Sequence, residues 1–190
     1  MTIKLLIKKY KLRVSHGFTV LETIVAIGIV SLAIAGTFSA VRTGLVTSIN
    51  AKDEIRAFYL SQEAIEILRN KRDNNKLIVF NGGSASWLSG IADIASDPCY
   101  PGKTCIVDAT LIPMALTTCA GGWGTCPPIN YSSVNSLYGY DASWTATKYT
   151  REIQIEKNDD DEVAVIINIS WMQGLNNRQI KVKTLLSNWF

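Results

Sequence analysis

The feature that most limits how this 190-residue chain can fold is an apolar run at residues 18–41. The run holds 24 residues, and Glu22 is its one charged side chain. A helix of about 20 apolar residues crosses the ~30 Å hydrocarbon core of a bilayer, so this run is long enough to span a membrane. A carboxylate inside a span is unfavourable by on the order of a few kcal/mol, and it usually has a partner. Glu22 therefore needs an explanation.

The charges around the run predict its orientation. The whole chain carries a net charge of +3, and the first 17 residues carry +5 with no acid, which leaves −2 for the rest. Cations that flank a membrane span stay on the cytoplasmic side. We therefore expect a single-pass membrane protein with its amino terminus in the cytoplasm and everything after about residue 41 outside it. The five cations are Lys4, Lys8, Lys9, Lys11 and Arg13.

Two simple interpretations of the apolar run are open at this point. One is a plain single-pass anchor, and the other is a secretory signal peptide cut after the small-residue stretch Ala33-Ile34-Ala35. Glu22 fits neither of them well. Because an acid near the cytoplasmic end of a span is less unfavourable than one at its centre, Glu22 alone does not decide between them.

The order of residues at the start of the run is more specific. The hexapeptide Gly17-Phe18-Thr19-Val20-Leu21-Glu22 follows a short basic leader and opens the apolar segment. This arrangement closely resembles the amino-terminal signature of type IV prepilins and type II secretion pseudopilins. In that family a membrane-embedded prepilin peptidase cuts after the glycine and methylates the new amino terminus. The resemblance implies a cleaved leader of residues 1–17, cleavage between Gly17 and Phe18, and N-methylation of Phe18.

The resemblance also implies a role for Glu22 in assembly. Cleavage creates a cationic α-amine on Phe18, and the carboxylate of Glu22 on a neighbouring subunit can pair with it where the dielectric constant is low. The implied function is that of a structural subunit, a minor pilin or pilin-like protein, of a type IV pilus or related filament. The implied partners are the prepilin peptidase, other pilin subunits and the assembly platform.

Within the same family, a pseudopilin of a type II secretion or competence system is the alternative. The processed chain would then lie in a periplasmic pseudopilus instead of a cell-surface pilus. The carboxyl end, Trp171-Met172-Gln173-Gly174 followed by residues 185–189, resembles the terminal strands of minor pilins of the pilus modification and assembly kind. That part of the resemblance is looser than the amino-terminal hexapeptide.

The pattern predicts one long helix over residues 18–73, with residues 18–41 as its membrane and assembly half and residues 42–75 as an amphipathic outer half. No turn signal interrupts the chain before residues 72–75. Many pilins have a proline in the span, and Gly36 is expected to supply a softer break here, since glycine lowers helix stability by ~1 kcal/mol. The outer half has an apolar stripe at three- and four-residue steps, which we expect to pack on a globular domain: Ile55, Phe58, Tyr59, Leu60, Ala64, Ile65, Ile67 and Leu68. Polar residues are expected on its other side: Lys52, Asp53, Arg56, Glu63 and Glu66.

The carboxyl-terminal part, residues 149–190, predicts an antiparallel β-meander. Its β-branched residues alternate with polar ones, and five apolar side chains share one face: Val163, Val165, Ile167, Ile169 and Trp171. The expected strands are 149–157, 163–171 and 178–186. The fold class is therefore α+β, and the resemblance implies a type IV pilin-like fold in which the long helix packs on this sheet. Residues 76–148 are expected to be a variable, cysteine-containing loop region with a short helix at residues 87–94.

The four cysteines, Cys99, Cys105, Cys119 and Cys126, all follow the apolar run. Their even number suits an oxidising compartment, where disulfides persist. Four cysteines allow three pairings, and we favour 99–105 with 119–126, because the first pair encloses a Pro-Gly turn and the second a glycine-rich loop. A zinc site is the alternative, although gaps of five and six residues exceed the usual two to four.

The sequence offers little catalytic chemistry. Its one histidine, His16, lies in the leader, so the processed chain has no Ser-His or Cys-His pair. We expect no enzyme and no cofactor. The net charge of −2 after the leader also makes nucleic acid a poor candidate as a partner.

Two binding hypotheses remain. The acidic stretch Asp159, Asp160, Asp161 and Glu162 is a weak calcium candidate, since Ca²⁺ prefers carboxylate oxygens, but its spacing is no EF-hand and it also suits a solvated hairpin tip. The alternative from a different class is a membrane-anchored extracytoplasmic binding protein, which would present its Trp- and Tyr-rich loops to a carbohydrate or DNA.

Overall fold

The computed structural model describes residues 17–111 and 113–188. Residues 1–16 of the predicted leader, with its five cations and His16, lie outside the described residues, as do residues 189–190. The described part is α+β, as predicted, with a helix α1 (Val20–Phe80) and a seven-stranded sheet. The chain divides into two compact units, Met1–Ile49 and Asn50–Phe190.

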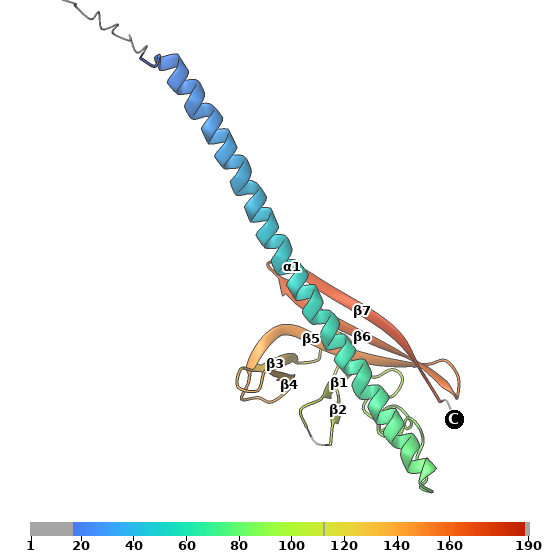
Figure 1. Cartoon of the computed structure of the whole chain (residues 1–190). Coiled ribbons are helices and arrows are strands. Elements are labelled where there is room, and N and C mark those ends of the chain that lie inside the picture. The colour runs from blue at the N-terminus through green and yellow to red at the C-terminus, as the bar shows by residue number, and fades with distance from the viewer. Residues whose placement is uncertain (1–16, 112, 189–190) are drawn as a thin grey trace, which may run out of the picture. The chain divides into compact units, whose positions relative to one another are not determined.

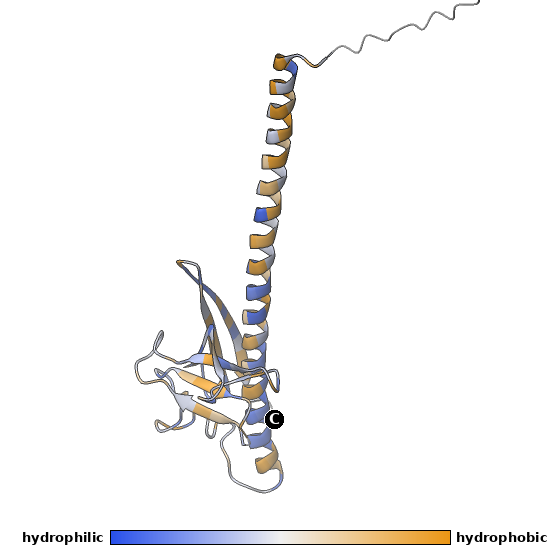
Figure 2. Ribbon diagram, turned by 90° about the vertical axis from the view of Figure 1, so that its left-hand side faces the viewer, coloured by the Kyte–Doolittle hydropathy of each residue, from blue (hydrophilic) through white to orange (hydrophobic). Residues whose placement is uncertain are grey.

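The part of α1 in the first unit is apolar and unbroken. In Figure 2 the first half of the helix is mostly orange, and blue bands become frequent only in its second half. The helix passes through Gly28 and Gly36 without interruption, so the expected softening at Gly36 is not seen in this chain. Glycine lacks a side chain but keeps its backbone N–H, and a local cost of ~1 kcal/mol is too small to break a long helix.

The helix ends at Phe80, later than the predicted end near residue 73. Asn75, which suggested a turn, stays helical and donates through its side-chain amide to the carbonyl oxygens of Trp87 (3.1 Å) and Ser89 (2.9 Å). The actual stop is Gly82, whose φ of 84° is typical of a glycine after a helix. The backbone N–H of Gly83 then donates to Ile78 O at 2.9 Å and closes the last turn.

The outer half of α1 buries most of the predicted apolar stripe, from Leu60 to Leu68, but not its first part. Ile55, Phe58 and Tyr59 were expected in the core, but they are 56%, 47% and 64% exposed. Asp53, expected on the solvent side, is buried. The carboxylate of Asp53 has hydrogen-bond partners on β5, so Asp53 can be buried. The helix therefore turns this side toward the sheet and leaves Ile55, Phe58 and Tyr59 exposed. The apolar members of the buried face are Ala57, Leu60, Ala64, Ile65, Ile67 and Leu68.

The sheet is built around β5 (Thr145–Lys157). One edge of β5 pairs with β6 (Glu162–Gln173), which pairs in turn with β7 (Asn176–Ser187), all antiparallel. These are the three strands of the predicted meander, each longer than expected. The face of β6 predicted to be apolar, from Val163 to Trp171, is buried, and it belongs to the same core as the buried face of α1. Figure 1 shows the outer half of α1 lying along β5 and β6.

The other edge of β5 pairs with two short hairpins from the region expected to be loops. One hairpin is β1 (Cys105–Asp108) with β2 (Ala115–Thr118), and the other is β3 (Pro128–Ser132) with β4 (Leu137–Gly139). Strands of three to five residues carry too few alternating positions to stand out in a sequence.

The short helix expected at residues 87–94 is not formed. The segment is a series of turns, with one α-turn between the N–H of Ala92 and the carbonyl of Leu88 at 3.1 Å. Trp87, Leu88, Ile91 and Ala92 are nevertheless buried. The helix-like apolar spacing therefore reflects burial of a single turn, which Gly90, with its φ of 70°, does not allow to continue as a helix.

Candidate functional site

The segment before α1 has no regular secondary structure and is exposed. Gly17, Phe18 and Thr19 lie outside the helix, and the Phe18 side chain is 76% exposed. A Cβ placed on Gly17 would meet no atom within 4 Å, and its φ is not in the left-handed region. The fold of this chain therefore places no requirement for glycine at position 17. A requirement for glycine at this position would have to come from another molecule that binds the segment.

Thr19 caps the start of α1. Its Oγ1 accepts a hydrogen bond from the backbone N–H of Glu22 at 3.2 Å, and its carbonyl accepts from the N–H of Thr23 at 3.1 Å. A threonine followed three residues later by a glutamate has the spacing of a capping box. Glu22 lies in the first turn, where the partial positive charge of the helix end favours an acid. A glutamate at this position therefore stabilises the start of α1, whether or not it also pairs with another subunit.

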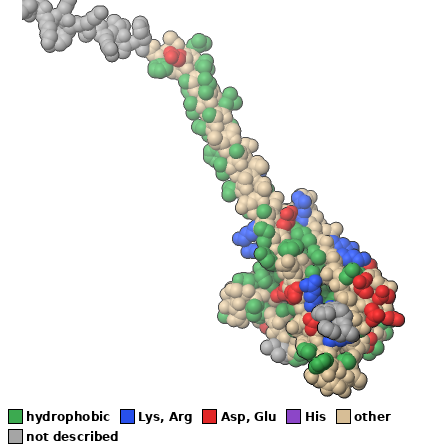
Figure 3. All heavy atoms as spheres, turned by 45° about the vertical axis from the view of Figure 1, so that its right-hand side comes forward, with side chains coloured by type: hydrophobic (Ala, Val, Ile, Leu, Met, Phe, Trp, Pro, Cys, Tyr) green, Lys and Arg blue, Asp and Glu red, His purple; other side chains and the backbone are tan. Residues whose placement is uncertain are grey.

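The helix behind this motif is long and apolar enough to cross a membrane, with a mean hydropathy of 2.3 over its best window, and none of that window is buried. Within the described residues its apolar side chains have no cover of their own: Val20, Leu21, Ile24, Ile27, Ile29, Leu32 and Phe38 are among those exposed. Figure 3 shows an acidic side chain in red at the start of the helix, followed by green and tan turns. Such a surface is compatible with cover by lipid or by other apolar helices.

The cysteines form the favoured pairs. Cys99 bonds to Cys105 and Cys119 to Cys126, each with a Cα–Cα distance of 5.2 Å. Because all four sulfur atoms are bonded, none is free as a thiolate ligand, and the zinc alternative is wrong. The first pair lies in the main core, and the second packs with Ile106 in a smaller cluster.

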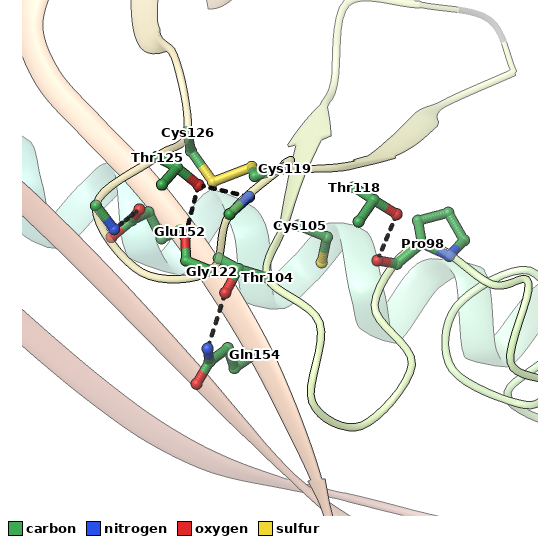
Figure 4. Close-up of a disulfide and its surroundings, with 12 residues drawn as sticks. Pro98, Thr104, Cys105, Thr118, Cys119, Gly122, Thr125, Cys126, Glu152 and Gln154 are labelled. Carbon is green, nitrogen blue, oxygen red and sulfur yellow. Dashed lines mark hydrogen bonds between the residues drawn. A yellow bond between two sulfur atoms is a disulfide. The ribbon is translucent and has the colours of Figure 1, made fainter.

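The loop closed by Cys119 and Cys126 covers a buried carboxylate that the sequence did not reveal. Glu152 is 1% exposed, and its Oε1 accepts a hydrogen bond from the backbone N–H of Gly124 at 2.5 Å. Figure 4 shows the loop beside β5, held by the Thr125 hydroxyl, which donates to Gly122 O at 2.7 Å. Glu152 alternates with Ile153 along β5, a pattern typical of a solvent-facing side chain, and nothing in the sequence indicates that a distant loop covers it.

The acidic stretch forms the tip of the β5–β6 hairpin. Asp160 pairs with Lys157 at 2.6 Å, and hydrogen bonding to this amine lowers the pKa of the carboxyl. Asn158 donates to the Glu162 carboxylate at 2.9 Å, and Asn188 donates to Asp161 at 2.7 Å. No group of three or more metal-binding side chains comes together anywhere in residues 17–111 and 113–188. The hairpin thus carries local polar contacts and gives no geometric support to the calcium hypothesis.

A polar cluster joins α1 to β5. The carboxylate of Asp53 accepts from Lys148 Nζ at 2.5 Å and from the Tyr149 hydroxyl at 2.8 Å. Burial tends to raise the pKa of Asp53, but the hydrogen bonds from Lys148 and Tyr149 outweigh it and hold the pKa below its usual value. Burial, together with the hydrogen bond to Asp53, raises the pKa of Tyr149 to about 12, so this phenol stays neutral. No periodic pattern could have predicted this pairing across the fold.

Comparisons of the chain with protein-family models, with curated proteins and with solved structures found no match. The interpretation of its function therefore depends on the residues themselves. The most informative of them are Gly17, Phe18, Thr19 and Glu22, which stand together at the start of a membrane-length helix.

Proposed function

We propose that this chain is a structural subunit of a type IV pilus or a related filament, processed by a prepilin peptidase between Gly17 and Phe18. The observation that carries the proposal is the hexapeptide Gly17–Glu22 at the start of an exposed, apolar helix that follows a basic leader. The scissile bond would lie in an exposed segment without regular secondary structure, as proteolysis requires. The cations of the leader would keep this segment on the cytoplasmic side of the membrane.

Processing would change the role of the helix. Before cleavage it anchors the chain in the bilayer, and the outer domain of residues 50–188 lies outside the cytoplasm. After cleavage and N-methylation, the same apolar surface can leave the lipid only if the helices of other pilin subunits cover it. The anchor would thereby become part of the filament core.

Glu22 would favour the transfer of the helix from the membrane into the filament. Removal of residues 1–17 leaves a cationic amine on Phe18, four residues before the carboxylate. In an apolar surrounding an unpaired carboxylate is unfavourable, so Glu22 of one subunit and the amine of Phe18 on its neighbour stabilise each other. The pair would also fix the axial position of each subunit. Thr19 caps the helix and so keeps Glu22 in the first turn.

The experiment is a comparison of two alanine variants in cells that assemble the filament. Glu22→Ala should be cleaved normally but be depleted at least tenfold from filaments sheared off the surface, while it accumulates in the membrane fraction. Glu54→Ala removes an exposed acid from the same helix and should assemble like the wild type. Equal incorporation of the two variants would contradict the pairing of charges.

The same filaments distinguish a pilin from a pseudopilin. A minor pilin is expected in surface pili at a small fraction of the main subunit, whereas a pseudopilin stays in a periplasmic assembly. Quantitative mass spectrometry of sheared pili measures the ratio directly. Absence from pili, together with co-purification with a secretion or competence assembly platform, would favour the pseudopilin.

A further inference from the structure

A cavity of about 340 Å³ opens on the outer domain between α1 and the amino-terminal half of β5. Three tyrosines and two cations contribute to its lining, and they come from α1, β3, β4 and β5. They are Arg56, Tyr131, Tyr138, Lys148 and Tyr149. None of these residues belongs to the processing motif, to a disulfide or to the acidic hairpin.

Two of the tyrosines form an aromatic wall. Tyr131 and Tyr138 lie directly opposite each other on β3 and β4, with ring centroids 5.0 Å apart and ring planes at 47°. Both side chains are half-buried, so each is held by its neighbours and still presents a surface to the cavity. Tyr149, at the inner end, is 2% exposed and is fixed by its hydrogen bond to Asp53.

The cavity has two cations, and one of them, Arg56, makes no direct salt bridge among the described residues. Lys148 is paired with Asp53 at 2.5 Å, which neutralises the nearest carboxylate. Arg56 is exposed and lies near enough to Asp53 and Tyr149 to exert a lowering effect on the pKa of each, but it makes no direct salt bridge with a carboxylate in the part of the chain that the structure describes. Its guanidinium offers a planar fork of N–H donors, a shape that fits a carboxylate better than a point charge does.

Aromatic faces beside a single guanidinium favour one class of ligand. A sugar ring stacks its C–H surface on a tyrosine face, its hydroxyls can bond with the phenols and with Thr145, and a carboxylate on the ring pairs with arginine. The volume is at the lower end for small-molecule sites, which suits one or two sugar rings. We propose that this cavity binds a carboxylated sugar unit of an acidic saccharide, with the carboxylate on Arg56 and the ring against Tyr131 and Tyr138.

Single-stranded nucleic acid fits the cavity less well. Aromatic stacking would serve its bases, but a bound strand also needs a row of cations that follows successive phosphates. Here one of the two cations is already paired with Asp53, and the chain after residue 17 has a net charge of −2.

The proposed site lies entirely in residues 50–188, so saccharide binding requires neither cleavage at Gly17 nor assembly into a filament. A failure of either proposal therefore leaves the other intact.

The test is a titration of the full-length chain in detergent micelles, measured by calorimetry and by saturation-transfer difference NMR. The probes are tetragalacturonate, a hyaluronan tetrasaccharide, sialyllactose, neutral cellotetraose and an oligo-dT of ten nucleotides. At least one carboxylated probe should bind at least tenfold more tightly than cellotetraose. Arg56→Gln and Tyr138→Ala should each weaken that binding about tenfold or more.

Two control variants remove the same side-chain types from outside the cavity. Arg178→Gln lies on β7 and Tyr59→Ala on the exposed face of α1, and both should bind like the wild type. Because Arg56 is exposed, its substitution is expected to leave the fold intact, which circular dichroism checks. Four results would each overturn the proposal: no binding of any carboxylated probe, equal binding of cellotetraose, tighter binding of oligo-dT, or equal weakening by Arg56→Gln and Arg178→Gln.

Discussion

Arg151 on β5 has no exposed surface, and its Nη1 donates to the carboxylate of Glu63 on α1 at 2.6 Å. The same nitrogen also donates to the carbonyl of Leu60 at 3.1 Å, and Nη2 donates to the carbonyl of Val107 on β1 at 2.6 Å. One guanidinium thus ties the helix to two strands from inside the core. A buried cation with these partners is costly to disturb, because removing it takes away three hydrogen bonds and the partner of the Glu63 carboxylate.

Replacement of Arg151 by methionine should lower the free energy of unfolding by about 2 kcal/mol, as expected for lost hydrogen bonds to a charged group, because the Glu63 side chain left behind is 36% exposed. Urea unfolding of the chain in detergent, followed by tryptophan fluorescence, measures this loss. The control is Arg69→Ala, which breaks the exposed pair with Glu66 at 2.7 Å and should cost under ~1 kcal/mol. Equal losses would mean that Arg151 contributes little beyond an ordinary surface contact.

The hydrogen bonds of Asp53 with Lys148 and Tyr149 predict that the stability of the fold depends on pH. The pKa of this carboxyl is lower in the folded state than its ordinary value of 3.8, so the folded chain holds this proton less tightly than the unfolded chain. The contribution of Asp53 to the free energy of unfolding is therefore present above the ordinary pKa, and it is lost as the pH falls through the pKa of the folded state. Asp53→Asn should lower stability at pH 7 by about 1–3 kcal/mol, as expected for hydrogen bonds to a charged group. The gap between variant and wild type should shrink below about pH 4, and a gap that is constant from pH 7 to pH 3 would contradict this account.

The Cys119–Cys126 disulfide should hold the loop over Glu152. The chain-entropy model gives about 2 kcal/mol of stabilisation for a loop this short. Cys119→Ser combined with Cys126→Ser should lower stability by this amount and raise the hydrogen-exchange rate of the Gly124 amide at least tenfold, since that amide donates to Glu152. Cys99→Ser with Cys105→Ser is the control for the exchange measurement, because that pair lies in the other cluster. Unchanged exchange at Gly124 in the first variant would show that the loop needs no disulfide.

A substitution at Gly17 tests whether another protein recognises the junction between the leader and the helix. Since a Cβ at position 17 meets no atom within 4 Å and the position is exposed, Gly17→Leu should leave the fold of the chain unchanged. It should nevertheless block cleavage, which an electrophoretic shift of the membrane form detects. Gly44→Leu, at another open glycine, should be cleaved normally. Normal processing of Gly17→Leu would argue against recognition by a prepilin peptidase.

The elements that the sequence predicted are those with long, regular patterns. The helix and the meander of β5, β6 and β7 extend over many residues, so periodicity identifies them even where their ends shift. The two cysteine pairs are close in sequence, and local turn geometry was enough to favour them. The helix end was misplaced because Asn75 is typical of turns, whereas here its amide bonds to Trp87 and Ser89 across the fold.

The features that the sequence missed depend on contacts between distant segments. Asp53, Arg151 and Glu152 are buried charges, and each has hydrogen-bond partners on other elements, up to 96 residues away. Periodicity treats a charged side chain as solvent-facing, so it placed Asp53 outside and the apolar Ile55 and Phe58 inside. The cavity beside β5 could not be predicted for the same reason, because α1 and three strands that are distant in the sequence form its lining.

The most direct test of the proposed function is the identity of the amino terminus in the membrane form of the protein. Intact-mass measurement and terminal sequencing, on cells with and without the prepilin peptidase, read it without any variant. We predict a chain that begins with N-methyl-Phe18 when the peptidase is present and with Met1 when it is absent. A chain that still begins with Met1 in peptidase-containing cells, or one that begins at Gly36, would contradict this prediction.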